Sequence, residues 1–150
     1  MYGAAVETVN TPSLCSLEMA IAVEEWLERY RRAWETADAD AVVELFTDDA
    51  SYRSNIFADA HLGRDAIRAY WERATATQKA VAVQIGRPFV DGERVAAEWW
   101  TTMEDEDDGA EITLPGCLLL TFDADGRCRE LREYWQVEPG RLAPPDGWGT

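Results

Sequence analysis

Three evenly spaced Asp-Gly dipeptides in the second half of the chain constrain its fold most strongly. They stand at 91–92, 108–109 and 125–126, so each lies 17 residues from the next. Asp-Gly readily adopts the positive φ angles that a tight hairpin turn needs. The spacing therefore predicts a meander of four antiparallel strands, at about 79–90, 93–104, 110–123 and 127–137.

Helical patterns dominate the first half of the chain. Apolar residues between 17 and 37 recur at helical spacing, and most of the charged residues fall on the opposite side. Asp40 is a good N-cap for a short second helix, and Gly63 opens a third one. The whole pattern predicts one domain at 17–138, preceded by a flexible arm at 1–16 and followed by a Pro/Gly-rich tail at 139–150.

Charge and composition exclude several classes of function. The 150 residues carry a net charge of −15, which argues against nucleic acids and anionic membrane surfaces, because both bind through clustered Lys and Arg. No stretch approaches the roughly 20 apolar residues of a membrane span, and no signal peptide is recognisable. The three cysteines are scattered without CxxC spacing, so we expect reduced thiols in a cytoplasmic protein. Five consecutive acids at 104–108 predict a solvated hairpin tip, with an occasional divalent cation as the alternative.

Four motifs in order suggest a known family. They are the helix aromatics Trp26, Tyr30 and Trp34, the segment Leu45-Phe46-Thr47-Asp48-Asp49-Ala50, the helix start Gly63-Arg64-Asp65-Ala66-Ile67, and Asp125-Gly126-Arg127 before Glu133-Tyr134-Trp135. With these motifs the chain resembles the nuclear transport factor 2-like superfamily, also described as SnoaL-like or ketosteroid-isomerase-like, over about residues 20–137. The resemblance implies an α+β cone, in which a curved antiparallel sheet wraps around three helices and encloses a pocket. It also implies a homodimer through the outer face of the sheet.

Hairpin geometry assigns side chains to the two faces of the sheet independently of the family. With two-residue turns, Trp99 lies opposite both Leu118 and Gln84, and Leu118 lies opposite Glu133. The pocket face then carries Gln84, Trp99, Thr101, Leu118, Leu120, Leu131, Glu133 and Trp135. The outer face carries Val81, Val83, Ile85, Glu98, Trp100, Leu119, Arg132 and Tyr134, and its apolar members predict the dimer interface. A register slip of one residue would exchange the two faces.

Glu133 is the most informative polar residue of this pattern. A carboxyl among Trp and Leu side chains loses solvation, so its pKa should rise toward the range useful for proton transfer. A salt bridge to Arg53 or Arg132 is the alternative. Tyr30 would donate a hydrogen bond to a ligand carbonyl or to Glu133 itself. His61, the only histidine, would lie at the pocket mouth as a second acid or base, or else be an exposed loop residue.

The catalytic groups of known relatives are only partly present. Of the three groups of a ketosteroid isomerase only Tyr30 is found, because Ser54 and Leu118 occupy the positions of the two acids. Of the limonene-epoxide-hydrolase pattern Glu133 and Tyr52 are found. Trp99 and Thr101 stand in place of its Arg and second acid, and Ser54 in place of its Asn. The remaining walls of the predicted ligand site are Trp34, Tyr52, Ser54, Gln84, Trp99, Thr101, Leu118, Leu120 and Trp135.

These observations lead to two hypotheses on function. Metal ligand patterns and nucleotide-binding glycine loops are absent from the sequence, so no metal or cofactor is expected. The first hypothesis is a cofactor-free enzyme that isomerises, cyclises or dehydrates an apolar polyketide-, terpenoid- or steroid-like compound by proton transfer. The second is a non-catalytic binder or scaffold with the same pocket. A protein-interaction module like the transport factor itself is the least favoured reading.

Overall fold

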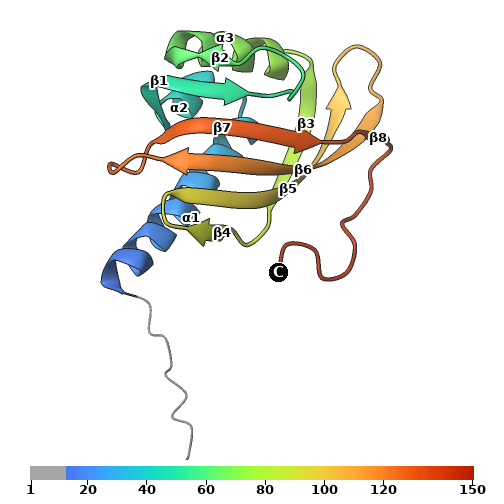
Figure 1. Ribbon diagram of the computed structural model, residues 1–150. Helices are drawn as coiled ribbons and strands as arrows, with labels where there is room; N and C mark the ends of the chain where they lie inside the picture. Colours follow the sequence, from blue (N-terminus) through green and yellow to red (C-terminus); the bar gives the residue numbers. More distant parts are fainter. Residues whose placement is uncertain (1–12) are drawn as a thin grey trace, which may run out of the picture.

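A computed structural model describes residues 13–150 (Figure 1). The predicted arm at 1–16 therefore lies mostly outside the described residues. Two helices come first, α1 (Leu14–Glu35) and α2 (Ala39–Val43). A third helix, α3 (Gly63–Thr75), follows after the first two strands. The strands are β1 (Phe46–Arg53), β2 (His61–Leu62), β3 (Gln78–Ile85), β4 (Phe89–Asp91), β5 (Arg94–Asp105), β6 (Glu111–Phe122), β7 (Cys128–Trp135) and β8 (Glu138–Pro139).

The strands form one curved sheet with the helices on its concave side. Its order is β2-β1-β7-β6-β5-β3, with β4 beside β5 and β8 beside β6. The sheet is mixed, because β1 runs parallel to β7 while the other pairs are antiparallel. In Figure 1, α1 passes behind the sheet and α3 lies along the β1 and β2 end. The predicted α+β class is confirmed.

Local hydrogen bonds explain where the first two helices begin. Ser13 caps α1 by accepting the N–H of Ser16 at 3.3 Å. Asp38, and not Asp40 as predicted, caps α2, since its carboxylate accepts the N–H of Ala41 at 2.9 Å. Capping side chains satisfy the N–H groups that a helix leaves free in its first turn.

Two of the three predicted hairpin registers preserve the expected faces. Leu118 lies opposite Glu133 as predicted. Between β5 and β6, Trp99 lies opposite Gly116 rather than Leu118, because the turn is longer than two residues. Asp105 organises this longer turn by accepting N–H groups of Asp107 and Asp108. A shift of two residues leaves every side chain on its predicted face.

The predicted register of β3 is wrong by one residue. The two faces of that strand are therefore exchanged relative to the prediction. Gln84 lies opposite Trp100 and is exposed on the outer face, so it is not a wall of an inner pocket. Val81, Val83 and Ile85 pack against the core, so they are not part of an outer apolar patch. The cause is an extra residue in the break between β3 and β4, where Pro88 has no N–H to pair with β5.

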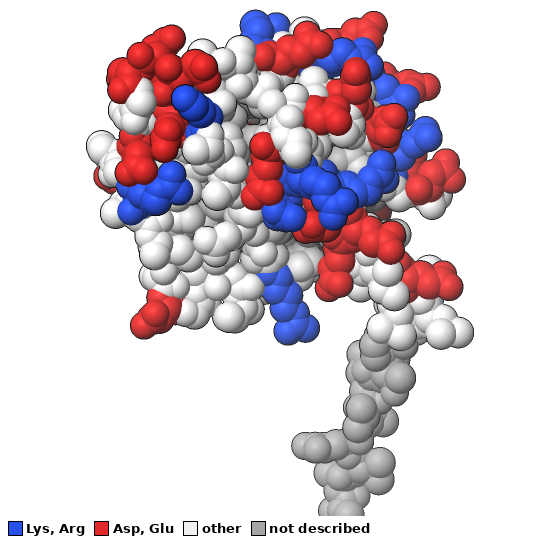
Figure 2. All heavy atoms as spheres, turned by 180° about the vertical axis from the view of Figure 1, so that it is seen from behind, with Lys and Arg blue, Asp and Glu red and all other residues white. Residues whose placement is uncertain are grey.

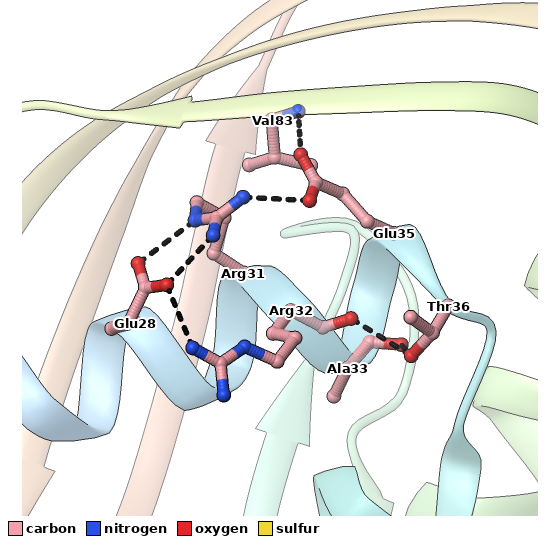
Figure 3. A network of polar contacts seen from close by, with 7 residues as sticks. All are labelled: Glu28, Arg31, Arg32, Ala33, Glu35, Thr36 and Val83. Carbon is pink, nitrogen blue, oxygen red and sulfur yellow. Dashed lines mark hydrogen bonds and ion pairs between the residues drawn. The ribbon is translucent and has the colours of Figure 1, made fainter.

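A polar network fixes β3 to α1 beside a second irregularity in this strand (Figure 3). Glu35 on α1 accepts the backbone N–H of Val83 at 2.9 Å. Arg31 donates to the other oxygen of Glu35 at 2.6 Å and to Glu28 at 2.7 Å. The side chain of Glu35 thus satisfies a backbone N–H of β3, which is the last strand in the sheet order and has a strand neighbour on one side only.

Acidic and basic side chains lie side by side over much of the face seen in Figure 2. Within residues 13–150, no helix is long and apolar enough to cross a membrane. The same part of the chain holds no cluster of three His, Cys, Asp or Glu side chains suited to a metal ion.

Candidate functional site

A buried carboxyl group surrounded by tyrosines is the main polar feature of the interior. Glu133 on β7 is 7% exposed, and its Oε1 accepts hydrogen bonds from the hydroxyls of Tyr52 and, at 3.1 Å, Tyr30. The two hydroxyls are themselves 3.1 Å apart. Tyr52 reaches Glu133 because β1 runs beside β7, and Tyr30 reaches it from α1. Three elements distant in sequence therefore meet at one carboxyl oxygen.

Burial dominates the protonation of this cluster. It raises the pKa of Glu133 from its ordinary 4.5 to about 7, although the hydrogen bonds from Tyr52 and Tyr30 act in the opposite direction. Burial, and the nearby Glu133 carboxylate after it, raise the pKa of both tyrosines well above the usual value, so both remain neutral donors. The carboxyl is thus poised between its acid and base forms near neutral pH.

The predicted alternative, a salt bridge to Glu133, is not present in the described part of the chain. Arg53 donates to the carbonyl of Ala58. Arg132 has Glu130 as its nearest carboxylate, at 3.7 Å. The environment of Glu133 is therefore made of neutral hydroxyls, which compensate lost hydration only in part.

Tyr70 on α3 is a third member of this cluster that the sequence analysis did not single out. Its ring centroid lies 5.2 Å from that of Tyr52. Burial raises the pKa of Tyr70, and the Glu133 charge raises it further. The helical pattern places Tyr70 on the buried side of α3, but its approach to Glu133 depends on how α3 crosses β1.

His61 packs on this tyrosine. Its ring stacks on Tyr70 with centroids 4.6 Å apart and planes at 24°. Burial, with the charge of Arg73 second, lowers the pKa of His61. No carboxylate among the described residues hydrogen-bonds to His61, so the orienting partner that an acid-base histidine needs is not present at this ring.

The space expected to be a pocket between the helices and the sheet is filled by indole rings. Trp34 contacts Trp99 and Trp71, with centroids 5.1 Å and 5.8 Å apart. Trp99 lies so close to Gly116 that a Cβ there would stand 2.3 Å from its ring. Thr101, Leu118 and Leu120, also predicted as pocket walls, are buried in the same core.

An open hollow of about 630 Å³ lies instead at the free end of β7. Strand β1 stops pairing with β7 at Arg132, so the following residues of β7 form an edge that the hollow follows. Glu133 and Trp135 are the two predicted site residues that line it. The complete lining is Asn55, Ile56, Phe57, Glu98, Pro115, Gly116, Cys117, Glu133, Tyr134, Trp135, Gln136 and Trp148.

Two other predicted ligand-site residues make structural hydrogen bonds near this region. Ser54 accepts the indole N–H of Trp135 through its backbone carbonyl at 2.7 Å. Trp34 donates its indole N–H to Gln78 at 2.9 Å, which fixes α1 to the start of β3. The structure thus joins Glu133, Tyr30, Tyr52 and Trp135 around one edge. It leaves the other predicted walls in the core, except Ser54, which is half-buried, and Gln84, which is exposed on the outer face.

Solved structures share this fold. A protein with a ketosteroid isomerase-like fold from Catenulispora acidiphila, in complex with trimethylamine, is 21% identical, with 73% of this chain and 84% of that chain covered and a TM-score of 0.67. The epoxide hydrolase/cyclase-like enzyme SalBIII, described for pyran ring formation in the polyether salinomycin, is 22% identical. The match covers 83% of this chain and 97% of that chain, with a TM-score of 0.70. A provisionally named scytalone dehydratase from Novosphingobium aromaticivorans is 14% identical, with 89% and 95% covered and a TM-score of 0.74.

The family itself follows from a match in sequence. No curated protein matches the chain. The model of the SnoaL-like domain matches residues 27–131, which run from the middle of α1 through the sheet as far as Leu131 and include Tyr30, Tyr52 and Tyr70. The chain therefore belongs to the SnoaL-like domain family, within the nuclear transport factor 2-like superfamily.

Proposed function

We propose that this protein is a cofactor-free enzyme that moves a proton on an apolar carbonyl- or hydroxyl-bearing compound of the polyketide, terpenoid or steroid type. Isomerisation, cyclisation and dehydration all fall within this chemistry. The observation that carries the proposal is the pKa of Glu133, raised to about 7 in a residue that lines the hollow. An acid or base is most effective when its pKa lies near the working pH.

The tyrosines support a simple sequence of proton transfers. Ionised Glu133 accepts a proton from the carbon next to a ligand carbonyl, and the carboxyl becomes neutral. Its acceptor oxygen then holds the Tyr30 and Tyr52 hydroxyls less strongly, because a carboxylate is the better acceptor. A freed hydroxyl can donate to the oxyanion that forms on the ligand. Return of the proton to another ligand atom completes an isomerisation and restores the carboxylate.

In this proposal the remaining predicted site residues shape and support the site and take no part in proton transfer. Trp135 forms a wall of the hollow, and Ser54 holds its indole N–H. Trp34, Trp99, Thr101, Leu118 and Leu120 form the packed layer behind Glu133. His61 sits behind Tyr70 and supports the proposal least, since no carboxylate orients it.

Hydrogen-deuterium exchange tests the chemistry without a known substrate. In D₂O, 2-tetralone and 2-decalone should exchange their α-protons faster in the presence of the protein, as followed by proton NMR. Glu133→Gln should remove this acceleration while keeping the shape of the side chain. Glu130→Gln is the matched control, because Glu130 is an exposed carboxylate on the same strand. Equal exchange with wild type and Glu133→Gln would overturn the proposal.

A non-catalytic binder is the second candidate, and the filled interior favours it. Wild-type protein that binds both ketones without accelerating exchange, with affinities unchanged in Glu133→Gln, would identify a binder.

A homodimer and a cytoplasmic location are further parts of the proposal. The outer face still exposes Phe89 of β4, next to Leu119, and exposed apolar side chains of this kind favour association. Light scattering of wild type and Phe89→Asp at micromolar concentration tests the dimer. A reducing compartment is supported by the three cysteines, Cys15, Cys117 and Cys128, all free thiols in the described part of the chain.

A further inference from the structure

The tail at 140–150 crosses the outer face of the sheet as an ordered strap. Thr113 of β6 donates its hydroxyl to the carbonyl of Gly140 at 2.7 Å and accepts the N–H of Leu142 at 2.9 Å. The indole N–H of Trp100 donates to the Leu142 carbonyl at 2.9 Å. The first turn of the strap is thus held by three hydrogen bonds to the sheet.

The far end of the strap is held by a contact between two glycines. The Arg87 N–H donates to the Gly149 carbonyl at 2.8 Å. A Cβ on Gly86 would stand 2.8 Å from the Cα of Gly149, which is closer than real Cβ contacts allow. Any larger residue at 86 must therefore push the strap away from the sheet.

Between these two anchors the strap presents Trp148 to the candidate site. The ring of Trp148 packs edge-on against Trp100, with centroids 6.0 Å apart at 73°. Trp148 is half-buried and lines the same hollow as Glu133. The strap therefore supplies one wall of this hollow, from a segment beyond the matched family domain.

Aromatic rings from three segments surround the hollow. Phe57, in the loop after β1, is 97% exposed, while Tyr134 and Trp135 of β7 are 44% and 41% exposed. The charged residues of the lining are Glu98 and Glu133, and Lys and Arg are absent from it. Aromatic faces favour flat ligand rings, and two carboxylates disfavour an anionic ligand.

We propose that the strap is a wall of the ligand-binding hollow and that Trp148 is a specificity-determining residue that selects flat, uncharged aromatic or conjugated ligands. This inference rests on the proposed function, because it takes the hollow beside Glu133 as the ligand site. Trp148 contributes ring contact and no proton transfer, so its effect belongs to binding rather than to chemistry.

Calorimetric titration with a matched pair of ligands tests the inference. The ketone 2-tetralone carries a flat aromatic ring, and 2-decalone has the same ring skeleton in saturated form. Wild type should bind 2-tetralone roughly fivefold or more tightly than 2-decalone, the ratio expected for one good ring contact. Trp148→Ala should abolish the preference, and Trp148→Phe should retain most of it.

Gly86→Ala provides an independent route to the same result, because it displaces the strap without changing a lining residue. Its preference for 2-tetralone should fall as in Trp148→Ala. Gln84→Ala, an exposed substitution two residues earlier on β3, should keep the wild-type ratio. If Gly86→Ala does not fold by circular dichroism, Gly149→Ala replaces it, because the new Cβ would stand 3.0 Å from the Cα of Gly86. The inference would be overturned by a wild-type protein that binds 2-tetralone and 2-decalone equally, or by a Trp148→Ala protein that still binds 2-tetralone more tightly.

The binding test of Trp148 and the exchange test of Glu133 can fail independently of each other. Loss of preference in Trp148→Ala together with no Glu133-dependent exchange leaves the strap inference standing and removes the enzyme. Glu133-dependent exchange with an unchanged preference in Trp148→Ala removes the strap inference alone.

Discussion

The two ends of strand β7 differ in how they use aromatic neighbours. Near Leu131, which is fully buried, the space against the helices is packed with rings such as Tyr52, Phe46 and Trp26. Near Trp135 the rings stay partly open to solvent around the hollow. Glu133 lies at the boundary, buried enough to lose hydration and still part of the hollow's wall. The difference shows that a carboxyl group with a raised pKa can lie where a packed core ends.

Gly116→Ala should produce the largest effect, because Gly116 lies opposite Trp135, where the buried Trp99 ring packs against the wall of the hollow. The new Cβ would overlap the Trp99 ring, and we expect a loss of about 3 kcal/mol or more in the free energy of unfolding. Urea denaturation measures it. Cys117→Ala, the neighbour on the outer face, should cost about 1 kcal/mol or less. A similar small loss in Gly116→Ala would mean that Trp99 is free to move.

Glu133→Gln should remove a pH dependence of stability. Folded Glu133 keeps its proton up to about pH 7, whereas the unfolded chain releases it near 4.5. The folded state binds more protons in this window, so stability falls as pH rises through it, by about 3 kcal/mol in total. Urea denaturation should therefore show Glu133→Gln more stable than wild type at pH 8.5 and about equal at pH 4. Equal stability at both pH values would contradict the raised pKa.

Tyr52→Phe should raise the pKa of Glu133 further, because it removes a donor that stabilises the carboxylate. We expect a rise of about one unit, the equivalent of one hydrogen bond to a charged group. Carbon-13 NMR of the Glu133 carboxyl through a pH titration reads it directly. Tyr134→Phe on the outer face is the control and should leave that titration unchanged. A lowered pKa in Tyr52→Phe would show that the hydroxyl acts mainly as a shield from water.

Trp135→Phe should have the smallest effect, because it tests the open side. The substitution removes the hydrogen bond from the indole to the Ser54 carbonyl in a partly exposed position. A loss of about 1 kcal/mol or less is expected by urea denaturation. A loss as large as that of Gly116→Ala would mean that the rim is as tightly packed as the core.

The succession and the facing of β5, β6 and β7 could be predicted from the sequence, because Asp-Gly dipeptides mark where one strand ends and the next begins. Even the longer turn after Asp105 changed the register by two residues and so preserved the faces. The prediction for Gln84 was wrong because a single extra residue near Pro88 shifts the register of β3 by one. A shift of one residue exchanges the two faces of a strand. A bulge of this kind cannot be recognised in the pattern of apolar and polar residues.

Glu133 and its partner Tyr30 were also predictable, because a lone carboxylate on an apolar face has few ways to be satisfied. The filled interior was not. Whether a ring occupies or lines a cavity depends on contacts such as that of Trp99 with Gly116, which join different strands. Tyr70 was missed because only the placement of α3 brings it to the cluster.

The separation in sequence of the groups around Glu133 has a consequence for folding. Tyr52 is 81 residues from Glu133 and Tyr30 is 103 residues from it, whereas β5, β6 and β7 follow one another through hairpins. Contacts across long loops form late, because the entropy of closing the loop opposes them until other contacts exist. We therefore expect the meander to form first, with Glu133 hydrated and ionising as it does in a free peptide. The carboxyl of Glu133 then acquires its raised pKa only in the last folding step, when β1 joins the edge of β7.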